Sequence, residues 1–413
     1  MSRSMYTTMT HDEFPSELTI SFGSGPDRQT LQYEKVAWEI DGERRGLRYG
    51  ENPDQPAALY RLVNGNLILG AVEQIAPGRG LATTAELIQS GKHPGKINIT
   101  DADAALGILR YFHDEPACVI VKHNNPSGVA LGDTLSDAYN RALMADRIAA
   151  FGGAIALNRE VDPETAERIA AYYAEVVVAP EYSAAALAIF AKKKNLRVLR
   201  IADMARLESY VGTRFVDIKS LMDGGLALQW SFTPIDLDTR GFEPASGTLG
   251  GEAIAVHRLP TEAEERDMRF GWFVESGVTS NSVIYVKDRC TVAIGTGEQD
   301  RVGVARIARD KAYRRLADVL AYEAVGRGIE EITDPEEQRR YYAAAERERG
   351  GLVGATMVSD AFFPFRDGAE VGLKEGIAAI VQPGGALRDG EVIQAVNEYG
   401  ATMVFTGQRS FRH

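Results

Sequence analysis

A lysine and a histidine stand side by side at the end of an apolar run, in the segment "VIVKHNNPSGVA" of residues 119–130. A histidine exchanges protons near neutral pH, and a neighbouring lysine stabilises negative charge or, when desolvated, acts as an acid. Adjacent residues of a strand point to opposite faces, so Lys122 and His123 can reach one ligand only where the strand ends. For an arbitrary pair of this kind, a strand cap and a bond to a backbone carbonyl are the more frequent roles. We predict a buried strand up to Lys122, a loop at "NNPSG", and proton-transfer chemistry at this point.

Other segments hold residue types that bind anions or flat rings, although each is weak evidence by itself. "GLRYGENPDQPAAL" sets Arg48 beside Tyr49, a possible clamp for a phosphorylated nucleoside or simply a surface turn. "GTGEQDR" ends at Arg301 and lacks the third glycine of the dinucleotide fingerprint and the Lys-Ser/Thr of the P-loop. "SDAFFPFRDG" gathers three phenylalanines around a proline, a pattern typical of core or interface packing. The terminal "FTGQRSFRH" is basic and aromatic, and chain ends are by default solvated.

Composition limits the classes of protein that this chain can represent. Its 413 residues, 45% of them apolar, are enough for two domains. The formal charge of −12 argues against binding to nucleic-acid phosphates, which needs clustered Lys and Arg. Cys118 and Cys290 are too few for a disulfide framework, and neither these two nor His93, His113 and His257 form a pattern of metal ligands. No signal-peptide order or membrane-length apolar run is present, so we expect a soluble cytoplasmic protein without a metal site.

The order of predicted elements indicates an α/β protein. A helix is expected to begin at Asp101 in "ITDADAALGILRYFHD", followed by a strand in "EPACVIVK". One long helix is expected in "TLSDAYNRALMADRIAA", and another in "PETAERIAAYYAE" with proline at its start. Strands are expected in "FGGAIALNREVD" and "VVVAP". Alternating strands and helices of this length favour a layered α/β domain.

The second half of the chain repeats this plan. "TSNSVIYVKDRCTVAIGTGEQ" leads an apolar strand to Lys287, as "EPACVIVKHNNPSGVALGDT" leads one to Lys122, and a long helix follows in "DRVGVARIARDKAYRRLADVLAYEA". The segment 231–251 is rich in proline and glycine and has no periodicity, which is typical of a linker. We predict a short extension at 1–47 and two structurally similar halves at 48–230 and 231–413.

Taken together, these blocks resemble the transformylase region of the bifunctional purine-biosynthesis family of AICAR formyltransferase/IMP cyclohydrolase. The matching pieces, in family order, are "RYGENPDQ", "VKHNNPSGVA", "FGGAIALNREVD", "SNSVIYVKD", "IGTGEQDR", "RDKA", "SDAFFPFRDG", "IVQPGG" and "VFTGQRSFRH". The resemblance implies two duplicated cytidine-deaminase-like three-layer α/β/α halves without zinc, and a homodimer with active sites at the subunit interface. Only about 47 residues precede "RYGENP", so we expect a stand-alone formyltransferase whose product is cyclised by a separate IMP cyclohydrolase.

The resemblance also implies a reaction and roles for residues. The formyl group of 10-formyltetrahydrofolate, the co-substrate, passes to the 5-amino group of AICAR and gives FAICAR. His123 would remove the amine proton, Lys122 would stabilise the oxyanion or protonate the departing folate nitrogen, and Asn281 would hold the formyl oxygen or the carboxamide. Asp367 would contact the folate, and the terminal "RSFRH" would be ordered because its arginine is needed. The implied nucleotide contacts are Arg48, Tyr49, Lys122, Phe151, Gly152, Glu175, Asn281, Arg301, Phe362, Arg409 and Phe411.

Four residues depart from the family pattern, and the acidic ones keep a non-catalytic alternative open. Asp54 stands where the family commonly has His, and Ser127 where it has Cys. Glu298 and Asp300 add carboxylates beside Arg301, where like charge would weaken anion binding unless the side chains point away. The alternatives are a nucleotide-binding regulator that has lost catalysis and a bifunctional enzyme that also closes the ring.

Overall fold

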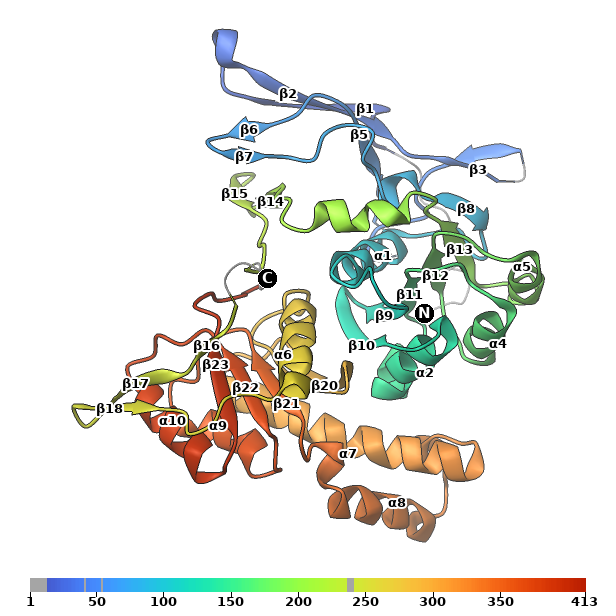
Figure 1. The fold of residues 1–413 in the computed structure, drawn as a ribbon. Coiled ribbons are helices and arrows are strands. Elements are labelled where there is room, and N and C mark those ends of the chain that lie inside the picture. The colour runs from blue at the N-terminus through green and yellow to red at the C-terminus, as the bar shows by residue number, and fades with distance from the viewer. Residues whose placement is uncertain (1–12, 41, 53–54, 236–240) are drawn as a thin grey trace. The chain divides into compact units, whose positions relative to one another are not determined.

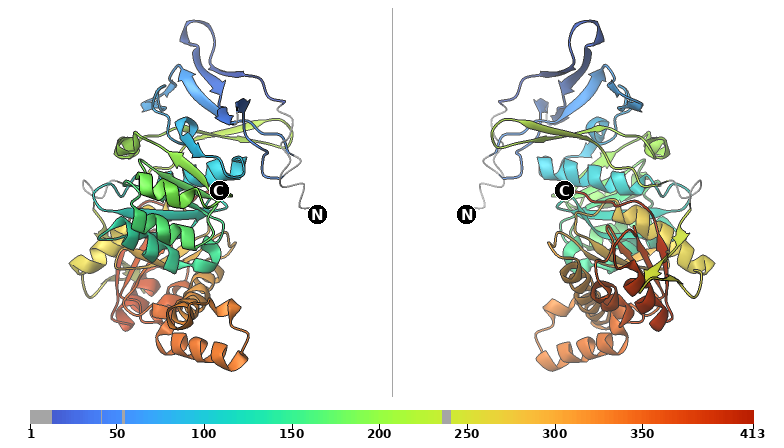
Figure 2. Two further views of the ribbon diagram at one scale, coloured as in Figure 1. Left: turned by 90° about the vertical axis from the view of Figure 1, so that its right-hand side faces the viewer. Right: turned by 90° about the vertical axis from the view of Figure 1, so that its left-hand side faces the viewer.

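The computed structural model of the chain describes residues 13–40, 42–52, 55–235 and 241–413. The described residues form two compact units of mixed α/β structure, which confirms the predicted α/β class, while the duplication of cytidine-deaminase-like halves stays a prediction (Figures 1 and 2). The first unit holds Met1–Ala117, Val121–Asn124 and Gly152–Thr233, and the second holds Cys118–Ile120, Asn125–Phe151 and Pro234–His413. The units therefore do not follow chain order, because residues 125–151 group with the C-terminal part. None of the helices in these ranges is both long and apolar enough to cross a membrane.

The main sheet of the first unit has a parallel part and one antiparallel edge. β11, β12 and β13 run parallel, and β8 pairs antiparallel with β13. Every residue of β11 and β12 is buried, as expected for parallel strands that are covered on both faces. The elements of this part are β8 (Glu86–Gln89), α1 (Lys96–Leu109), β11 (Ala154–Leu157), α4 (Pro163–Ala171), β12 (Val176–Ala179), α5 (Ala184–Phe190) and β13 (Arg197–Arg200). β9 (Ala117–Lys122) is divided, with Cys118–Ile120 grouped in the second unit and its remaining residues in the first.

Smaller antiparallel sheets complete the first unit. They are β1 (Glu17–Phe22), β2 (Gln29–Lys35) and β5 (Tyr60–Asn64) in one sheet, and the pairs β3 (Trp38–Ile40) with β4 (Glu43–Arg45), β6 (Ile68–Leu69) with β7 (Val72–Glu73), and β14 (Val216–Ser220) with β15 (Leu226–Trp230). The β14–β15 hairpin is amphipathic, since Ile218 lies opposite Leu228 on one face and Asp217 lies opposite Gln229 on the other. Its apolar face is open, because Leu226 is 61% exposed and Leu228 48%.

The second unit is a mixed sheet in the order β16-β23-β22-β21-β19-β20-β10. β21, β22 and β23 are parallel, and the remaining pairs are antiparallel. The strands are β10 (Asn125–Leu131), β16 (Glu243–Pro244), β19 (Val283–Lys287), β20 (Cys290–Gly295), β21 (Thr356–Ser359), β22 (Ala379–Gln382) and β23 (Thr402–Phe405), with a separate hairpin of β17 (Ser246–Leu249) and β18 (Glu252–Ala255). The helices are α2 (Leu135–Ala145), α3 (Arg147–Ala150), α6 (Glu262–Glu275), α7 (Arg301–Val325), α8 (Pro335–Arg347), α9 (Arg366–Leu373) and α10 (Asp389–Glu398).

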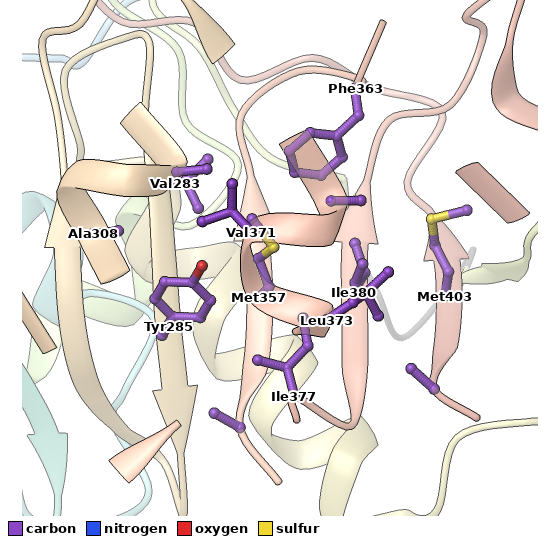
Figure 3. Close-up of a cluster of buried hydrophobic side chains, with 14 of the residues drawn as sticks. Val283, Tyr285, Ala308, Met357, Phe363, Val371, Leu373, Ile377, Ile380 and Met403 are labelled. Atoms are coloured by element: carbon purple, nitrogen blue, oxygen red, sulfur yellow. The ribbon is translucent and has the colours of Figure 1, made fainter. Parts of the chain in front are cut away.

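Helices cover both faces of this second sheet. On one face, α7, α9 and α10 bury a core against the strands that includes Tyr285, Met357 and Ile380 (Figure 3). α6 packs on the opposite face, where a Cβ on its Gly271 would lie 2.6 Å from a methyl group of Val358. Since Met357 and Val358 are consecutive in β21, they point to opposite faces. The sheet is thus the middle layer of three.

Several predicted element bounds are wrong for reasons that the contacts explain. α1 begins at Lys96 and not at Asp101, because the Tyr49 carbonyl accepts the Lys96 N–H at 2.9 Å. The expected long helix at 134–150 is divided at Asp146, which leaves the helical region and caps α3 through the Ala149 N–H. The expected loop "NNPSG" is a two-residue turn, because Asn125 already starts β10. The expected linker at 231–251 also contains β16 and β17, and its residues 236–240 lie outside the described chain.

Other predicted elements are confirmed. β9 ends at Lys122, and α4 begins at Pro163 with the Asp162 side chain accepting the Thr165 N–H at 2.7 Å. α7 covers the predicted long helix and ends at Val325, and the φ of 68° at the capping Gly326 is the left-handed conformation that glycine adopts without strain.

Candidate functional site

The turn after β9 holds the lysine and histidine in a specific backbone conformation. His123 and Asn124 have φ values of 56° and 59°, a left-handed conformation that costs a non-glycine residue about 1–2 kcal/mol. Asp101 fixes this turn, since its carboxylate accepts the His123 N–H at 3.3 Å and the Asn124 N–H at 2.7 Å. His123 is exposed and Lys122 is half-buried. The backbone of the turn is therefore held from inside while its side chains remain accessible.

Arg48 and Tyr49 lie at the N-terminal end of α1. The Arg48 guanidinium stacks 4.3 Å from the centroid of the Tyr49 ring, and its Nη2 donates to the Tyr49 hydroxyl at 2.7 Å. Arg48 is 7% exposed, and its backbone N–H donates to the Pro94 carbonyl at 2.9 Å. The pair is thus part of the packed structure, and the simple surface turn considered above is excluded.

Glu175 belongs to a cluster of polar side chains in the same unit, in which Arg197 is the buried member. Its carboxylate accepts from Asn98 Nδ2 at 3.0 Å and from Arg197 Nη1 at 3.4 Å. Arg197 is 2% exposed, so burial lowers its pKa, and the Glu175 charge opposes that shift. Gly152 donates its N–H to the Tyr173 carbonyl at 2.8 Å with a φ of 78°. Its left-handed backbone explains why glycine stands there.

α1 connects these groups within the first unit. Asn98 and Asp101 are three residues apart and share one side of the helix, so the same side contacts Glu175 and the His123 turn. Burial raises the pKa of Asp101, and the two N–H donors of the turn oppose the shift. The first unit therefore brings Arg48, Glu175 and the His123 turn into one neighbourhood around the start of α1.

Arg301 is the centre of a second set of residues, in the second unit. Its Nη1 donates to the Ser282 carbonyl at 2.9 Å, to Ser359 Oγ at 3.1 Å and to a carboxylate oxygen of Asp360. Its Nη2 donates to Asn281 Oδ1 at 2.9 Å. Arg301 is 8% exposed and Asp360 is fully buried. The guanidinium that the sequence assigned to a phosphate is therefore engaged with protein groups and orients Asn281.

Asn281 keeps hydrogen-bonding capacity in this arrangement. Its Nδ2 donates to the Gln299 carbonyl at 3.0 Å, and its backbone N–H donates to the Glu298 carbonyl at 3.2 Å. A side-chain amide has two N–H donors and two acceptor lone pairs. One donor of Asn281 is committed to the Gln299 carbonyl and one lone pair to Arg301. The fixed amide can present the other donor and lone pair to a ligand.

The C-terminal segment forms hydrogen bonds with Ser280, next to Asn281 in the chain, and with Asp360. The Ser280 N–H donates to the Arg412 carbonyl at 2.9 Å, and the Arg412 N–H donates to Ser280 Oγ at 3.1 Å. The Ser410 N–H donates to the Asp360 carbonyl at 2.9 Å. Arg409 stacks 4.2 Å from the Phe411 ring centroid. The predicted order of the tail is thus seen in its backbone hydrogen bonds.

Phe151, Phe362 and Asp367 are predicted contacts that form no hydrogen bond described above with the residues around the start of α1 or around Arg301. Phe151 is 52% exposed and Phe362 40% exposed, as suits residues that stack on a ring. Asp367 lies in the first turn of α9 and accepts the Gly368 N–H at 2.8 Å. A Cβ on Gly368 would lie 3.7 Å from Cγ of Arg301, so this turn is close to the second set. The convergence of His123 with Asn281 on one substrate stays a prediction.

The departures from the family pattern have local explanations. The Asp300 side chain caps α7 by accepting the Gly303 N–H at 2.6 Å, and Glu298 Oε1 accepts the Gln299 N–H at 2.9 Å. Both carboxylates thus have backbone donors. Ser127 Oγ donates to the Ile120 carbonyl at 3.3 Å, within a buried part of β10, while Asp54 lies outside the described residues. Across the described ranges, no group of three or more His, Cys, Asp or Glu side chains is placed to hold a metal ion.

Sequence reasoning missed the buried partners of the predicted site residues. Asp101, Arg197 and Asp360 each contact a residue that was singled out, yet each lies at least 20 positions away in the chain. One signal was available for Asp101. Asp267 occupies the same place in α6, ahead of the second strand-to-lysine segment, so the similar order of the two segments in the sequence could have marked both aspartates.

The fold and the two sets of residues define an α/β protein that presents basic, aromatic and amide groups where strands of mixed sheets end. Over residues 6–311 the sequence matches the family described as AICARFT/IMPCHase bienzyme, and the chain belongs to that family. It is 41% identical over 393 residues to the bifunctional purine biosynthesis protein PurH of Magnetococcus marinus, with 95% of this chain and 62% of that protein covered. It is 40% identical over 368 residues to PurH of Xanthomonas oryzae pv. oryzae, with 89% of this chain and 58% of that protein covered. The chain thus spans about three fifths of the length of these relatives.

Proposed function

We propose that this protein transfers the formyl group of 10-formyltetrahydrofolate to the 5-amino group of AICAR, in purine biosynthesis. A carbon–nitrogen bond forms between the formyl carbon and the amine, the bond from that carbon to the folate nitrogen breaks, and the amine proton ends on the folate nitrogen. Family membership supports the proposal. The observation that carries it is the turn that holds His123 next to Lys122 at the end of β9.

The chemistry explains why such a turn is useful. The amine lone pair of AICAR is delocalised into the imidazole ring and its carboxamide, so the nucleophile is weak and needs a base. In the proposal His123 accepts the amine proton. Lys122 stabilises the tetrahedral oxyanion or protonates the folate nitrogen as it leaves, and the proton held by His123 then balances that transfer. Asn281, fixed by Arg301, donates to the formyl oxygen or the carboxamide. Loss of one such donor typically raises the barrier by about 2.7–4 kcal/mol.

Binding of the nucleotide is assigned to the residues that the family resemblance implies. Arg48 and Tyr49 offer a cation and an aromatic ring at the start of α1, and Arg409 and Phe411 offer the same pair in the ordered tail. Glu175 and Gly152 are proposed as further contacts in the first unit, and we propose that Asp367 contacts the folate. The remaining proposed contacts with the nucleotide are Phe151, Arg301 and Phe362.

The test is an absorbance assay of tetrahydrofolate release from 10-formyltetrahydrofolate and AICAR. We expect turnover by the wild type and a fall of about a hundredfold or more in kcat for His123→Ala, in the range of general acid–base contributions. Asp288→Ala is the matched control, because Asp288 lies in the equivalent turn after β19 with a φ of 52° and has no proposed role in the reaction. Equal rates for wild type and His123→Ala would refute the proton-transfer role, and an inactive wild type would favour a nucleotide-binding regulator.

We further propose formyl transfer without ring closure, with a separate cyclohydrolase completing the sequence in the cytoplasm. The residue blocks that carry the family resemblance belong to the formyltransferase region, whereas the matched relatives are named as bifunctional. Incubation of the purified chain with FAICAR decides the matter. Formation of IMP at a rate comparable to formyl transfer would establish the bifunctional alternative.

A homodimer is also proposed, on the family resemblance. An isolated two-stranded hairpin is only marginally stable in water, and the apolar face of β14–β15 is open. This face favours an assembly that covers it, and the proposed occupant is a second copy of the chain.

A further inference from the structure

The two strand-to-strand turns of the internal repeat are built in the same way. After β9, His123 and Asn124 have φ values of 56° and 59°, and after β19, Asp288 and Arg289 have φ values of 52° and 54°. Each turn follows a lysine that ends its strand. Left-handed pairs of this kind usually contain glycine, asparagine or aspartate, so His123 and Arg289 are the less favourable choices for the conformation.

A buried aspartate stabilises each turn through the same two bonds. Asp267 accepts the Asp288 N–H at 2.9 Å and the Arg289 N–H at 2.6 Å, and Asp101 does the same for His123 and Asn124. Asp101 is the sixth residue of α1 and Asp267 the sixth residue of α6. They are 5% and 8% exposed. Both carboxylates thus supply a charged acceptor to two consecutive N–H groups, a stronger interaction than a neutral one.

We propose that Asp101 is a positioning residue for the reaction, which holds the strained turn in the one conformation that presents the His123 imidazole to the substrate. This inference rests on the proposed function. Strained backbone persists only where the surroundings over-determine it, and Asp101 is the group that does so here. In the second repeat the same device holds a turn without a histidine, so Asp267 has a structural role alone.

The aspartate cannot be replaced by asparagine without loss. An amide has one oxygen, so Asp101→Asn leaves one turn N–H facing an NH₂ group, donor against donor. A hydrogen bond to a charged group contributes about 1.5–3 kcal/mol, which corresponds to a factor of roughly 10–150 in the population of the held conformer. The same change at Asp267 disturbs an equivalent turn by an equivalent amount.

The experiment measures kcat and KM for AICAR in Asp101→Asn, Asp267→Asn, His123→Ala and the Asp101→Asn/His123→Ala double variant, with thermal midpoints for all. We expect kcat to fall at least about tenfold in Asp101→Asn, with KM changed less than about threefold, and to stay within about threefold of wild type in Asp267→Asn. Because Asp101 acts through His123, the double variant should be no slower than His123→Ala.

The outcomes separate this inference from the proposed function. If the wild type does not transfer formyl groups, the proposed function fails. If the wild type is active and Asp101→Asn matches Asp267→Asn in kcat, or if its effect multiplies with that of His123→Ala, Asp101 is structural and the positioning role is refuted. Should Asp101→Asn not fold, Asp101→Glu, which keeps the charge on a longer side chain, is measured for the same split between kcat and KM.

Discussion

Replacement of Arg301 by methionine should destabilise the second unit strongly, because it leaves a buried carboxylate without its cation. Asp360 is fully buried and pairs with Arg301, which is 8% exposed. In the variant the carboxylate keeps the Ser282 N–H donor at 3.1 Å. Removal of one partner of a buried ion pair typically costs about 3–5 kcal/mol. With a urea slope of about 2–3 kcal/mol/M, the unfolding midpoint should fall by roughly 1–2.5 M.

Tryptophan fluorescence can follow the unfolding of the second unit, which contains Arg301. The chain has three tryptophans, and Trp272 on α6 is fully buried in the second unit, whereas Trp38 and Trp230 belong to the first. A background in which Trp38 and Trp230 are replaced by phenylalanine therefore reports the unit that contains Arg301. Arg309→Met is the control, because the Arg309–Asp310 pair on the same helix lies at the surface, with side chains 33% and 67% exposed, and its loss should change the free energy of unfolding by less than about 0.5 kcal/mol.

A double-mutant cycle with Asp360→Asn tests the cause of the effect. A neutral asparagine no longer carries an unpaired charge, so the double variant should be less destabilised than the sum of the single variants by about 1–3 kcal/mol. If Arg301→Met shifts the midpoint no further than Arg309→Met does, or if the effects of Arg301→Met and Asp360→Asn simply add, then the ion pair does not stabilise this unit and our explanation of the Arg301 contacts is wrong.

Two further predictions concern pH and assembly. Burial and the nearby Asp360 charge raise the pKa of Glu275 well above its ordinary value of 4.5, so the folded state binds a proton that the unfolded state releases as pH rises above 4.5. Glu275 should therefore lower the free energy of unfolding progressively as pH rises above 4.5. The urea midpoint of Glu275→Gln should accordingly increase relative to that of wild type between about pH 5 and pH 8. A difference between the two midpoints that stays constant with pH would contradict this. Leu226→Lys, on the apolar face of β14–β15, should reduce the mass measured by light scattering toward that of one chain, while Asp217→Lys on the polar face should not, and equal masses would exclude this surface from the proposed dimer.

The sequence predicted elements whose signals are local. α4 begins with Asp162 and Pro163, and both the capping side chain and the proline act within one turn of the helix. β9 is a run of apolar residues that ends at a lysine, so its C-terminal bound could be predicted from this run alone. The start of α1 could not, because its first N–H is accepted by the Tyr49 carbonyl, which reaches it through tertiary structure.

The candidate site was predicted in the types of its residues but not in their partners. The chemistry of Lys122, His123 and Asn281 follows from what their side chains can donate or accept. Their surroundings depend on long-range contacts, such as that of Arg301 with Asp360, 59 positions further along the chain. A guanidinium looks the same in sequence whether it binds a phosphate or a buried carboxylate, and only its burial distinguishes the two.

The turns after β9 and β19 have the same backbone conformation but present different side chains. Both turns hold non-glycine residues in a left-handed conformation, and both depend on an aspartate at the sixth position of the preceding helix. The turn at Asp288 has the same strain and the same support without a proposed role in the reaction, so a strained turn of this kind does not require catalysis. What differs is the side chain presented, an imidazole in one turn and a carboxylate in the other. A rigid turn that the fold already stabilises needs only one substitution to present a proton-transfer group at a fixed place, and this is why we assign the precision of the site to Asp101 and its chemistry to His123.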